Sequence, residues 1–454
     1  MSGKLKRCLS LTEIVIYGVG LILGAGVYVL IGATAGLAGN MLWLSFLLAA
    51  LVASFTAASY AELSAMYPRA GAEYVYARAA FGWKGLAWMF GFVGVVLGFS
   101  TASAVAVGFA RYMSLFVPMD QTMIAVVLVI AMSFLNYWGI KESARFNALA
   151  TSIEVGGLLL IILAGGYFIL SGHIPLADLG QLPEAGTHSG FVWMPVISAG
   201  ALIFFAYMGF EDIANIAEEA ENPSYTLPRA YLYALLISTV IYVLVAIVAV
   251  SVLPYQELAQ SDQPLSAVMA SLLGGIAPQL IAVIALFATA NTVLITLIVC
   301  ARMIYGMARA SSLPAVLARI DSSRGTPYVG VALTGAITIA FLFFKEIEIL
   351  ASISDVGIFI LFLAVNLSNI ILRYRHPDKQ RPWRVPLNIG RFPVISLLGA
   401  VSCILMLFTL RHPVPIGDRE IPSLLLGLAI FALAVPLYFL LGRPGGETDL
   451  TRDE

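Results

Sequence analysis

Apolar segments about 20 residues long recur along nearly the whole chain, and this recurrence constrains the fold more than any other feature. A helix needs about 20 apolar residues to cross a bilayer. Hydrophobic residues make up 60% of the 454-residue chain and charged residues only 11%, whereas a soluble globular protein averages about 25% charged residues. The sequence therefore predicts an all-α integral membrane protein with twelve transmembrane helices, at residues 13–37, 41–66, 85–116, 121–140, 146–171, 191–217, 228–253, 267–307, 327–344, 348–373, 392–410 and 421–441.

The positive charges indicate how such a protein is oriented. Basic residues gather in the cytoplasmic connections of membrane proteins. An even number of spans places both termini on one side, and nearly all of the 25 Lys and Arg residues lie in connections on that side. The opposite side holds only Arg111, Lys345, Arg411 and Arg419. We therefore expect a multi-pass protein of the plasma membrane with both termini in the cytoplasm.

The composition also excludes several classes of function. The net charge is −1 and the basic residues are scattered between spans, so no nucleic-acid interface is expected. Cys8, Cys300 and Cys403 lack paired spacing, and no two of the four histidines have ligand spacing, so we expect no disulfide and no metal site. No nucleophile–base set or phosphate loop is apparent, so we expect neither an enzyme nor a bound cofactor.

The sixth apolar segment contains Gly209, Glu211 and Asp212 at what should be mid-membrane depth. One acidic residue at a helix centre costs roughly 2.5 to 3.5 kcal/mol. Two such residues in a row indicate that the helix is interrupted near Gly209 and that the acids face water, protein or a ligand. The sequence therefore predicts a discontinuous sixth helix.

The first apolar segment has a similar anomaly, because Gly24 and Gly26 flank a single alanine halfway along it. Glycine costs about 1 kcal/mol relative to alanine inside a helix. One explanation is close helix packing through the G-x-x-x-G pattern of Gly20 and Gly24. The other is an unwound segment whose main-chain groups bind ions or substrate. Interruptions in the first and sixth spans favour the second explanation and a five-plus-five inverted repeat followed by two further helices.

Four stretches together resemble the amino acid–polyamine–organocation (APC) superfamily of transporters, and the resemblance extends over nearly the whole chain. It implies a LeuT-type fold, alternating access, and an amino acid bound between the first and sixth spans. The stretches are GLILGAGVY at 20–28, YAELSAMYPRAGAEYVYARAAFG at 60–82, FFAYMGFEDIANIAEEAENP at 204–223, and ARMIYGMARASSLP at 301–314 followed by GTP at 325–327.

The resemblance implies a main-chain binding site around Gly24 in the first span. The N–H groups of Ala25 and Gly26 would hold the substrate carboxylate at a half-helix N-terminus. The substrate ammonium group would be accepted by main-chain carbonyls, those of Ile22, Phe204 and Tyr207.

The resemblance also assigns side-chain roles in the sixth span. Phe205 corresponds to an aromatic gate that closes over the ligand, although an apolar aromatic in a helix is more often an ordinary core residue. Glu211 corresponds to an acidic position that couples gating to protonation. Asp212 is expected to reach the cytoplasmic vestibule.

Glu154 lies about seven residues into the fifth span, roughly 10 Å deep at 1.5 Å per residue. Proton-coupled members of the superfamily often have lysine at this position, so Glu154 is a departure from that pattern. A buried carboxyl group favours its protonated form, and Glu154 is therefore a candidate proton carrier. The alternatives are a cation ligand, a partner for Arg302, or a tolerated acid near the interface.

Threonines of the eighth span form the last candidate group. Thr292 and Thr296 share one helix face, and by resemblance their hydroxyls would line an ion pocket beside Glu154. Alternatively, each hydroxyl bonds the carbonyl four residues earlier. Glu62 and Arg69, in the cytoplasmic motif after the second span, are expected to be structural residues that pair across the loop leading to Lys84.

The third span carries no acid before Arg111, which favours a neutral, small or apolar amino acid as substrate. Glu211 or Asp355 could instead supply a charge for a cationic amino acid or polyamine. The sequence thus predicts a secondary active transporter that couples amino acid uptake to protons, or to sodium. The alternatives are an obligate amino acid exchanger and, least favoured, a non-transporting amino acid sensor.

This interpretation divides the chain into five parts. They are a cytoplasmic N-terminus at 1–12, a transport core of ten spans at 13–373, a cytoplasmic loop at 374–391, two further spans within 392–441, and a cytoplasmic tail at 442–454. The loop is basic and interrupted by prolines, which favours a topology anchor beside anionic lipid over a partner-binding site.

Overall fold

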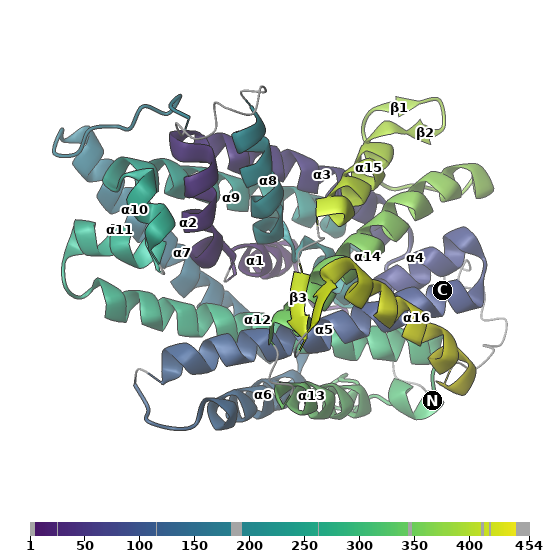
Figure 1. The fold of residues 1–454 in the computed structure, drawn as a ribbon. Helices are drawn as coiled ribbons and strands as arrows, with labels where there is room; N and C mark the ends of the chain where they lie inside the picture. Colours follow the sequence, from purple (N-terminus) through teal and green to yellow (C-terminus); the bar gives the residue numbers. More distant parts are fainter. Residues whose placement is uncertain are drawn as a thin grey trace.

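A computed structural model describes residues 5–24, 26–114, 116–182, 193–261, 263–343, 347–409, 413–416 and 419–441. Most of these residues are helical, and one large cluster of buried apolar residues forms the core. The elements, shown in Figure 1, are α1 (Leu11–Ile22), α2 (Gly26–Ala38), η1 (Gly39–Met41), α3 (Leu42–Met66), α4 (Ala72–Phe81), α5 (Lys84–Met113), α6 (Gln121–Trp138), α7 (Ile140–Leu170), α8 (Met194–Tyr207), η3 (Phe210–Glu219), α9 (Pro223–Val252), α10 (Tyr255–Gln260), α11 (Pro264–Leu273), α12 (Ala277–Arg309), η4 (Ala315–Ala318), α13 (Tyr328–Leu342), α14 (Ile347–Arg375), β1 (Asn388–Ile389), β2 (Phe392–Pro393), α15 (Val394–Thr409), β3 (Pro413–Ile416), β4 (Arg419–Pro422) and α16 (Ser423–Leu441).

Nine segments of the described chain are helical, long and apolar enough to cross a membrane. Three of the twelve expected spans, at 327–344, 392–410 and 421–441, correspond to the shorter apolar runs of α13, α15 and α16. The long eighth segment is divided into α11 and α12, as expected if a short helix precedes the span proper. An all-α membrane architecture is thus confirmed, while the exact set of twelve spans stays a prediction.

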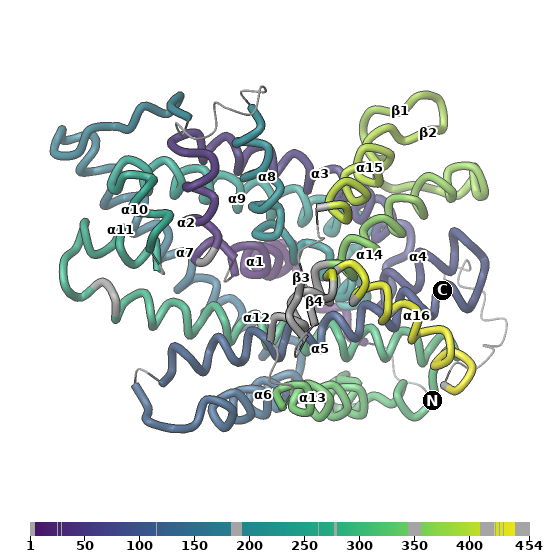
Figure 2. Tube along the Cα trace, viewed as in Figure 1, coloured from purple at the N-terminus to yellow at the C-terminus, as the bar shows by residue number. Residues whose placement is uncertain are grey.

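The first span is interrupted between α1 and α2. Helix α1 begins with a capping box, in which the Ser10 side chain and Glu13 satisfy each other's main-chain N–H groups. It ends at Ile22, and α2 starts at Gly26. The chain changes direction between the two helices, as Figures 1 and 2 show. The predicted discontinuity of this helix is therefore present.

The sixth span is interrupted as well. Helix α8 ends at Tyr207, Met208 is extended, and Gly209 has a φ of 116°, which residues with a β-carbon rarely adopt. The chain then continues for 10 residues as the 3-10 helix η3. Runs of this kind longer than three or four residues are uncommon and often mark functional hinges. Both predicted interruptions thus occur where glycine permits them.

The interrupted helices lie among several long helices. Helix α1 packs against α7 and α9, and α8 packs against α2 and α3. Helices α5 and α12 pack against each other, while α6 and α13 lie side by side along the lower edge of Figure 1. The N-terminal segment also crosses η3, because the N–H groups of Cys8 and Leu9 donate to the Glu219 carbonyl at 2.8 and 2.9 Å.

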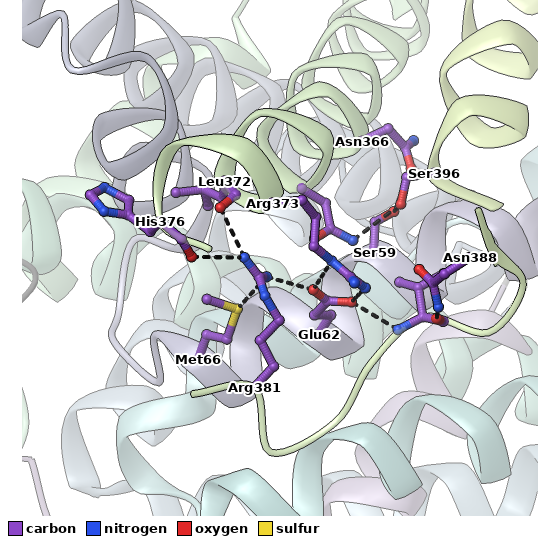
Figure 3. Close-up of polar contacts among 12 residues, drawn as sticks. Ser59, Glu62, Met66, Asn366, Leu372, Arg373, His376, Arg381, Asn388 and Ser396 are labelled. Carbon is purple, nitrogen blue, oxygen red and sulfur yellow. Dashed lines mark hydrogen bonds and ion pairs between the residues drawn. The ribbon is translucent and has the colours of Figure 1, made fainter. Parts of the chain in front are cut away.

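The basic loop after α14 folds back onto the protein. Arg373 and Arg381 both donate to the Glu62 carboxylate, each with a closest distance of 2.6 Å, and the Val385 N–H donates to it at 2.8 Å (Figure 3). Burial lowers the pKa of the Arg381 guanidinium, and the Glu62 carboxylate opposes this shift. Glu62 thus makes structural contacts, as expected. Its partners are Arg373 at the end of α14 and Arg381 and Val385 in the loop that follows, rather than the loop leading to Lys84.

These contacts change the interpretation of the loop as a lipid anchor. Arg373 and Glu62 are buried, at 6% and 0% exposure, and Arg375 donates to the Ala80 carbonyl at 2.8 Å. Guanidinium groups held in this way are not available to lipid headgroups. The end of α14 and the first part of the loop after it therefore bind α3 and α4, while a role of the rest of the loop as a lipid anchor stays a prediction.

Candidate functional site

A cavity of about 270 Å³ lies at the two helix interruptions. Such a volume is close to the lower end of the roughly 300–1,000 Å³ range of small-molecule sites. One side is formed by the interruptions themselves, and the opposite wall is mostly small or apolar. This wall comes from α5, α12 and α14, with residues Gly94, Leu97, Gly98, Val105, Val299, Met303, Ile358 and Leu361.

The two interruptions touch each other beside the cavity. A β-carbon at Gly26 would lie 3.1 Å from the Ala206 Cα, and one at Gly209 would lie 3.0 Å from the Leu21 β-carbon. Contacts this short are tighter than β-carbons normally make, so a side chain at either glycine would push the neighbouring chain away. The glycines therefore allow the main chains of the first and sixth spans to meet, as the unwound-segment interpretation requires.

Gly20 and Gly24 form the G-x-x-x-G pattern, but their surroundings differ, so helix packing explains only one of the two glycines. A β-carbon at Gly20 would lie 2.1 Å from the Thr151 hydroxyl, against a buried cluster in which Asn147 donates to Asn291 at 3.0 Å. Gly24 lines the cavity and faces Thr292. Gly20 thus serves helix packing, whereas Gly24 belongs to the interruption.

Tyr242 joins the two interruptions through its side chain. Its buried hydroxyl lies within hydrogen-bond distance of the main-chain carbonyls of Ile22 and Ala206, the latter at 3.0 Å, so its one proton is shared between the two carbonyls. Tyr242 is not recognisable from the sequence, because a tyrosine in an apolar span resembles any core aromatic. The only available signal is a hydroxyl that requires a partner once it is buried.

Some of the residues predicted to bind the substrate lie together at the cavity, and others do not. Ile22, Gly24, Gly26 and Phe205 line the cavity, whereas Phe204 and Tyr207 are not among its lining residues. Ala25 lies outside the described residues.

The three aromatic residues of α8 have separate partners. The Phe204 ring stacks on Phe359 with a centroid distance of 5.4 Å, and the Tyr207 ring meets Tyr242 edge to face at 5.3 Å. Phe205 also contacts Phe359, edge to face at 5.7 Å, from a position on the cavity wall. Of the three, Phe205 therefore has the location that a gate requires.

Three carboxylic acids line the cavity, namely Glu73, Glu211 and Asp212. Glu211 accepts a 2.8 Å hydrogen bond from the Gly209 N–H, so it caps the interruption that precedes it. Glu73 is 3% exposed; its Oε1 accepts from the Tyr60 hydroxyl at 3.0 Å, and its Oε2 accepts no hydrogen bond within the described chain. The lining residues given by the structure include no Lys, Arg or His. Glu73 was not predicted from the sequence as a site residue.

Glu154 is fully buried in α7, at 0% exposure, and it does not line the cavity. Neither carboxyl oxygen has a hydrogen-bond partner among the residues that the structure describes. Arg302 is paired with Glu219 at 3.1 Å and with Asn136 at 2.8 Å. The alternative that Glu154 is the partner of Arg302 is therefore wrong.

Thr292 and Thr296 both line the cavity on α12. Their hydroxyls donate to the carbonyls four residues earlier, at 3.0 Å to Ala288 and 2.8 Å to Thr292. The alternative in which each threonine hydroxyl bonds the carbonyl four residues earlier in its own helix is thus confirmed. The described residues include no cluster of His, Cys, Asp and Glu that could hold a metal ion, and the side chain of Asp355 lies outside the described part of the structure.

A many-helix membrane protein in which two interrupted helices meet at a cavity has the architecture of a small-molecule transporter. The chain belongs to the amino acid permease family, whose model matches residues 9–435. This membership confirms the resemblance to the APC superfamily.

Curated relatives are transporters of several substrates. The branched-chain amino acid permease BcaP of Bacillus subtilis is 29% identical over 95% of this chain and 93% of its own length. The methylthioribose transporter of the same species is 28% identical over 90% and 89%. The vacuolar cationic amino acid transporter 2 of Arabidopsis thaliana is 32% identical over 83% of this chain, but over only 61% of its own length.

Proposed function

We propose that this protein is a secondary active transporter that carries amino acids across the plasma membrane by alternating access. The observation that carries the proposal is the meeting of the interruptions at Ile22–Gly26 and Phe205–Gly209 beside one cavity. Main-chain N–H and carbonyl groups released by such interruptions suit the carboxylate and ammonium groups of an amino acid. The proposal includes a LeuT-type arrangement of twelve helices, with both termini in the cytoplasm.

We propose a neutral amino acid as the preferred substrate. The wall opposite the interruptions is small and apolar, with Leu97, Val105, Ile358 and Leu361 where a substrate side chain would rest. Similarity to the branched-chain permease supports this assignment. A cationic amino acid or polyamine is the second candidate, because Glu73, Glu211 and Asp212 line the cavity without a basic residue beside them among its described lining residues.

Proton coupling through Glu154 is also part of the proposal. A carboxyl group that is buried without hydrogen bonds is costly when ionised, so it favours a bound proton. Glu154 lies on α7, which packs against α9, the helix that carries Tyr242, and the Tyr242 hydroxyl lies at the carbonyls of both interruptions. A change of charge at Glu154 would therefore act on the substrate site through Tyr242, while Glu211 would sense protonation at the cavity itself.

Uptake into proteoliposomes tests this function. Vesicles without internal amino acid should accumulate labelled L-leucine or L-alanine when an inward proton gradient is imposed. An obligate exchanger would take up label only after preloading with substrate. Preference for L-lysine, L-arginine or putrescine would favour the second candidate. Binding without any flux, in vesicles whose correct insertion is verified, would indicate a sensor.

A further inference from the structure

A second cavity, of about 590 Å³, lies on the face of the protein that carries the N-terminal segment. It shares no lining residue with the cavity at the helix interruptions. Its walls come from the N-terminal segment, the loop before α4, the end of η3, the start of α9 and the end of α12. Nothing in the proposed transport cycle uses this cavity, and its chemistry is different.

The lining of the second cavity is strongly basic. Arg7, Arg69 and Arg309 contribute three guanidinium groups, against the single carboxylate of Glu218. Arg309 donates to Glu218 at 3.1 Å. The formal charge of these four lining residues is therefore positive even with that ion pair formed. Guanidinium groups bind phosphate oxygens through paired, charge-assisted hydrogen bonds.

The start of α9 adds a second source of positive potential. Pro223, Ser224 and Tyr225, the first residues of this 30-residue helix, line the same cavity. No side chain caps the helix at Asn222. The N-terminus of a helix carries roughly half a positive charge. Pro223 has no N–H and the Tyr225 N–H donates to the Asn222 carbonyl at 2.9 Å, so the helix contributes through its dipole. The helix and the arginines thus favour the same kind of ligand.

We propose that this cavity is a binding site for a phosphate-bearing anion. The ligand is either the headgroup of an anionic phospholipid or a soluble phosphate ester, since both present the same oxygens to the arginines. One lining residue, Tyr225, is 55% exposed, so the cavity is open at that residue. A bound anion would contact the N-terminal segment, α9 and α12 at once. It would thereby stabilise the packing of these three elements against one another.

Calorimetric titration of the purified, delipidated full-length protein tests the site. The two probes are inorganic phosphate, with chloride at equal ionic strength as control, and dioctanoylphosphatidylglycerol, with dioctanoylphosphatidylcholine as control. The variants are Arg7→Gln and Arg69→Gln. Arg319→Gln serves as the matched control, because Arg319 is an exposed arginine in a connection outside the cavity. Retention of thermal unfolding midpoints verifies that each variant is folded.

We expect saturable binding of at least one probe to the wild-type protein and to Arg319→Gln. The affinity should fall by about tenfold or more in each cavity variant, as expected from the loss of a charged hydrogen bond. Binding of phosphate alone identifies a soluble ligand, whereas binding of phosphatidylglycerol alone identifies a lipid headgroup. The proposal is overturned if neither probe binds saturably, or if Arg319→Gln weakens binding as much as Arg7→Gln does.

Discussion

Gly209 lies directly against Leu21, so that a β-carbon on the glycine would be 3.0 Å from the Leu21 β-carbon and 3.1 Å from its carbonyl carbon. Gly209 follows α8, which is the first part of the sixth span. Leu21 lies near the end of α1, which is the first part of the first span. Their contact explains why both spans can be interrupted at the same depth. The main chains approach one another there without an intervening side chain.

The first prediction follows from this contact. Gly209→Ala adds a β-carbon at a φ of 116° and against Leu21, so uptake should be lost or fall by at least tenfold. The matched control is Gly166→Ala in α7, where a β-carbon meets no atom within 4 Å. Helix propensity favours alanine at that position by up to about 1 kcal/mol. Uptake by both variants in proteoliposomes checks the prediction, and equal activity would contradict it.

The Tyr242 hydroxyl provides a second prediction. Tyr242→Phe keeps the ring packed against Tyr207 and Phe46 but removes the hydrogen bonds to Ile22 and Ala206. The single shared proton makes this one bifurcated interaction, whose loss costs about 0.5–1.5 kcal/mol, so the protein should remain folded. We expect weaker substrate binding and a lower maximal uptake rate, measured by concentration-dependent uptake. Tyr233→Phe, at an exposed tyrosine on the same helix, should behave like the wild type.

The buried Arg302–Glu219 pair allows a third prediction, about stability. Both side chains are almost fully buried, at 0% and 1% exposure. Arg302→Met leaves the carboxylate buried without its cation, which should destabilise the protein by about 3–5 kcal/mol. The double variant Arg302→Met, Glu219→Gln should recover much of that loss. Thermal unfolding in detergent measures both, and a double variant less stable than the single one would refute this explanation.

A fourth prediction separates coupling from binding. Glu154→Gln cannot exchange a proton, so uptake driven by a pH gradient should be lost. Exchange of labelled for unlabelled substrate should persist, because Glu154 lies outside the cavity lining. Glu142→Gln, at the first turn of the same helix, is the matched control. Unchanged pH-driven accumulation by Glu154→Gln would remove Glu154 from the mechanism.

Much of the fold was predictable because lipid imposes a simple rule on sequence. Apolar runs of sufficient length define the spans, and glycines or acids within a run indicate where its helix breaks. Gly24, Gly26 and Gly209 are therefore recognisable from the amino-acid sequence alone. The short helices α4 and α10 carry no comparable signal, because at 10 and 6 residues they are too short to form an apolar run of spanning length.

The side-chain partners within the site were not predictable in the same way. Glu62 binds Arg373 and Arg381, more than 300 positions away in the chain, and no local pattern specifies such pairs. Glu73 and Tyr242 also reach the site or its main chain from helices other than the two interrupted ones. Their roles depend on how helices pack, which periodicity alone does not determine.

The central claim is that an amino acid binds between the two interruptions, and ligand-induced thermal stabilisation tests it most directly. The twenty amino acids are screened against the purified wild-type protein, against Gly26→Val, which places a side chain on Ala206, and against Gly166→Ala. We predict that at least one neutral amino acid raises the unfolding temperature of the wild type and of Gly166→Ala, but not that of a folded Gly26→Val protein. Equal stabilisation of all three proteins would place the amino acid elsewhere and contradict the claim.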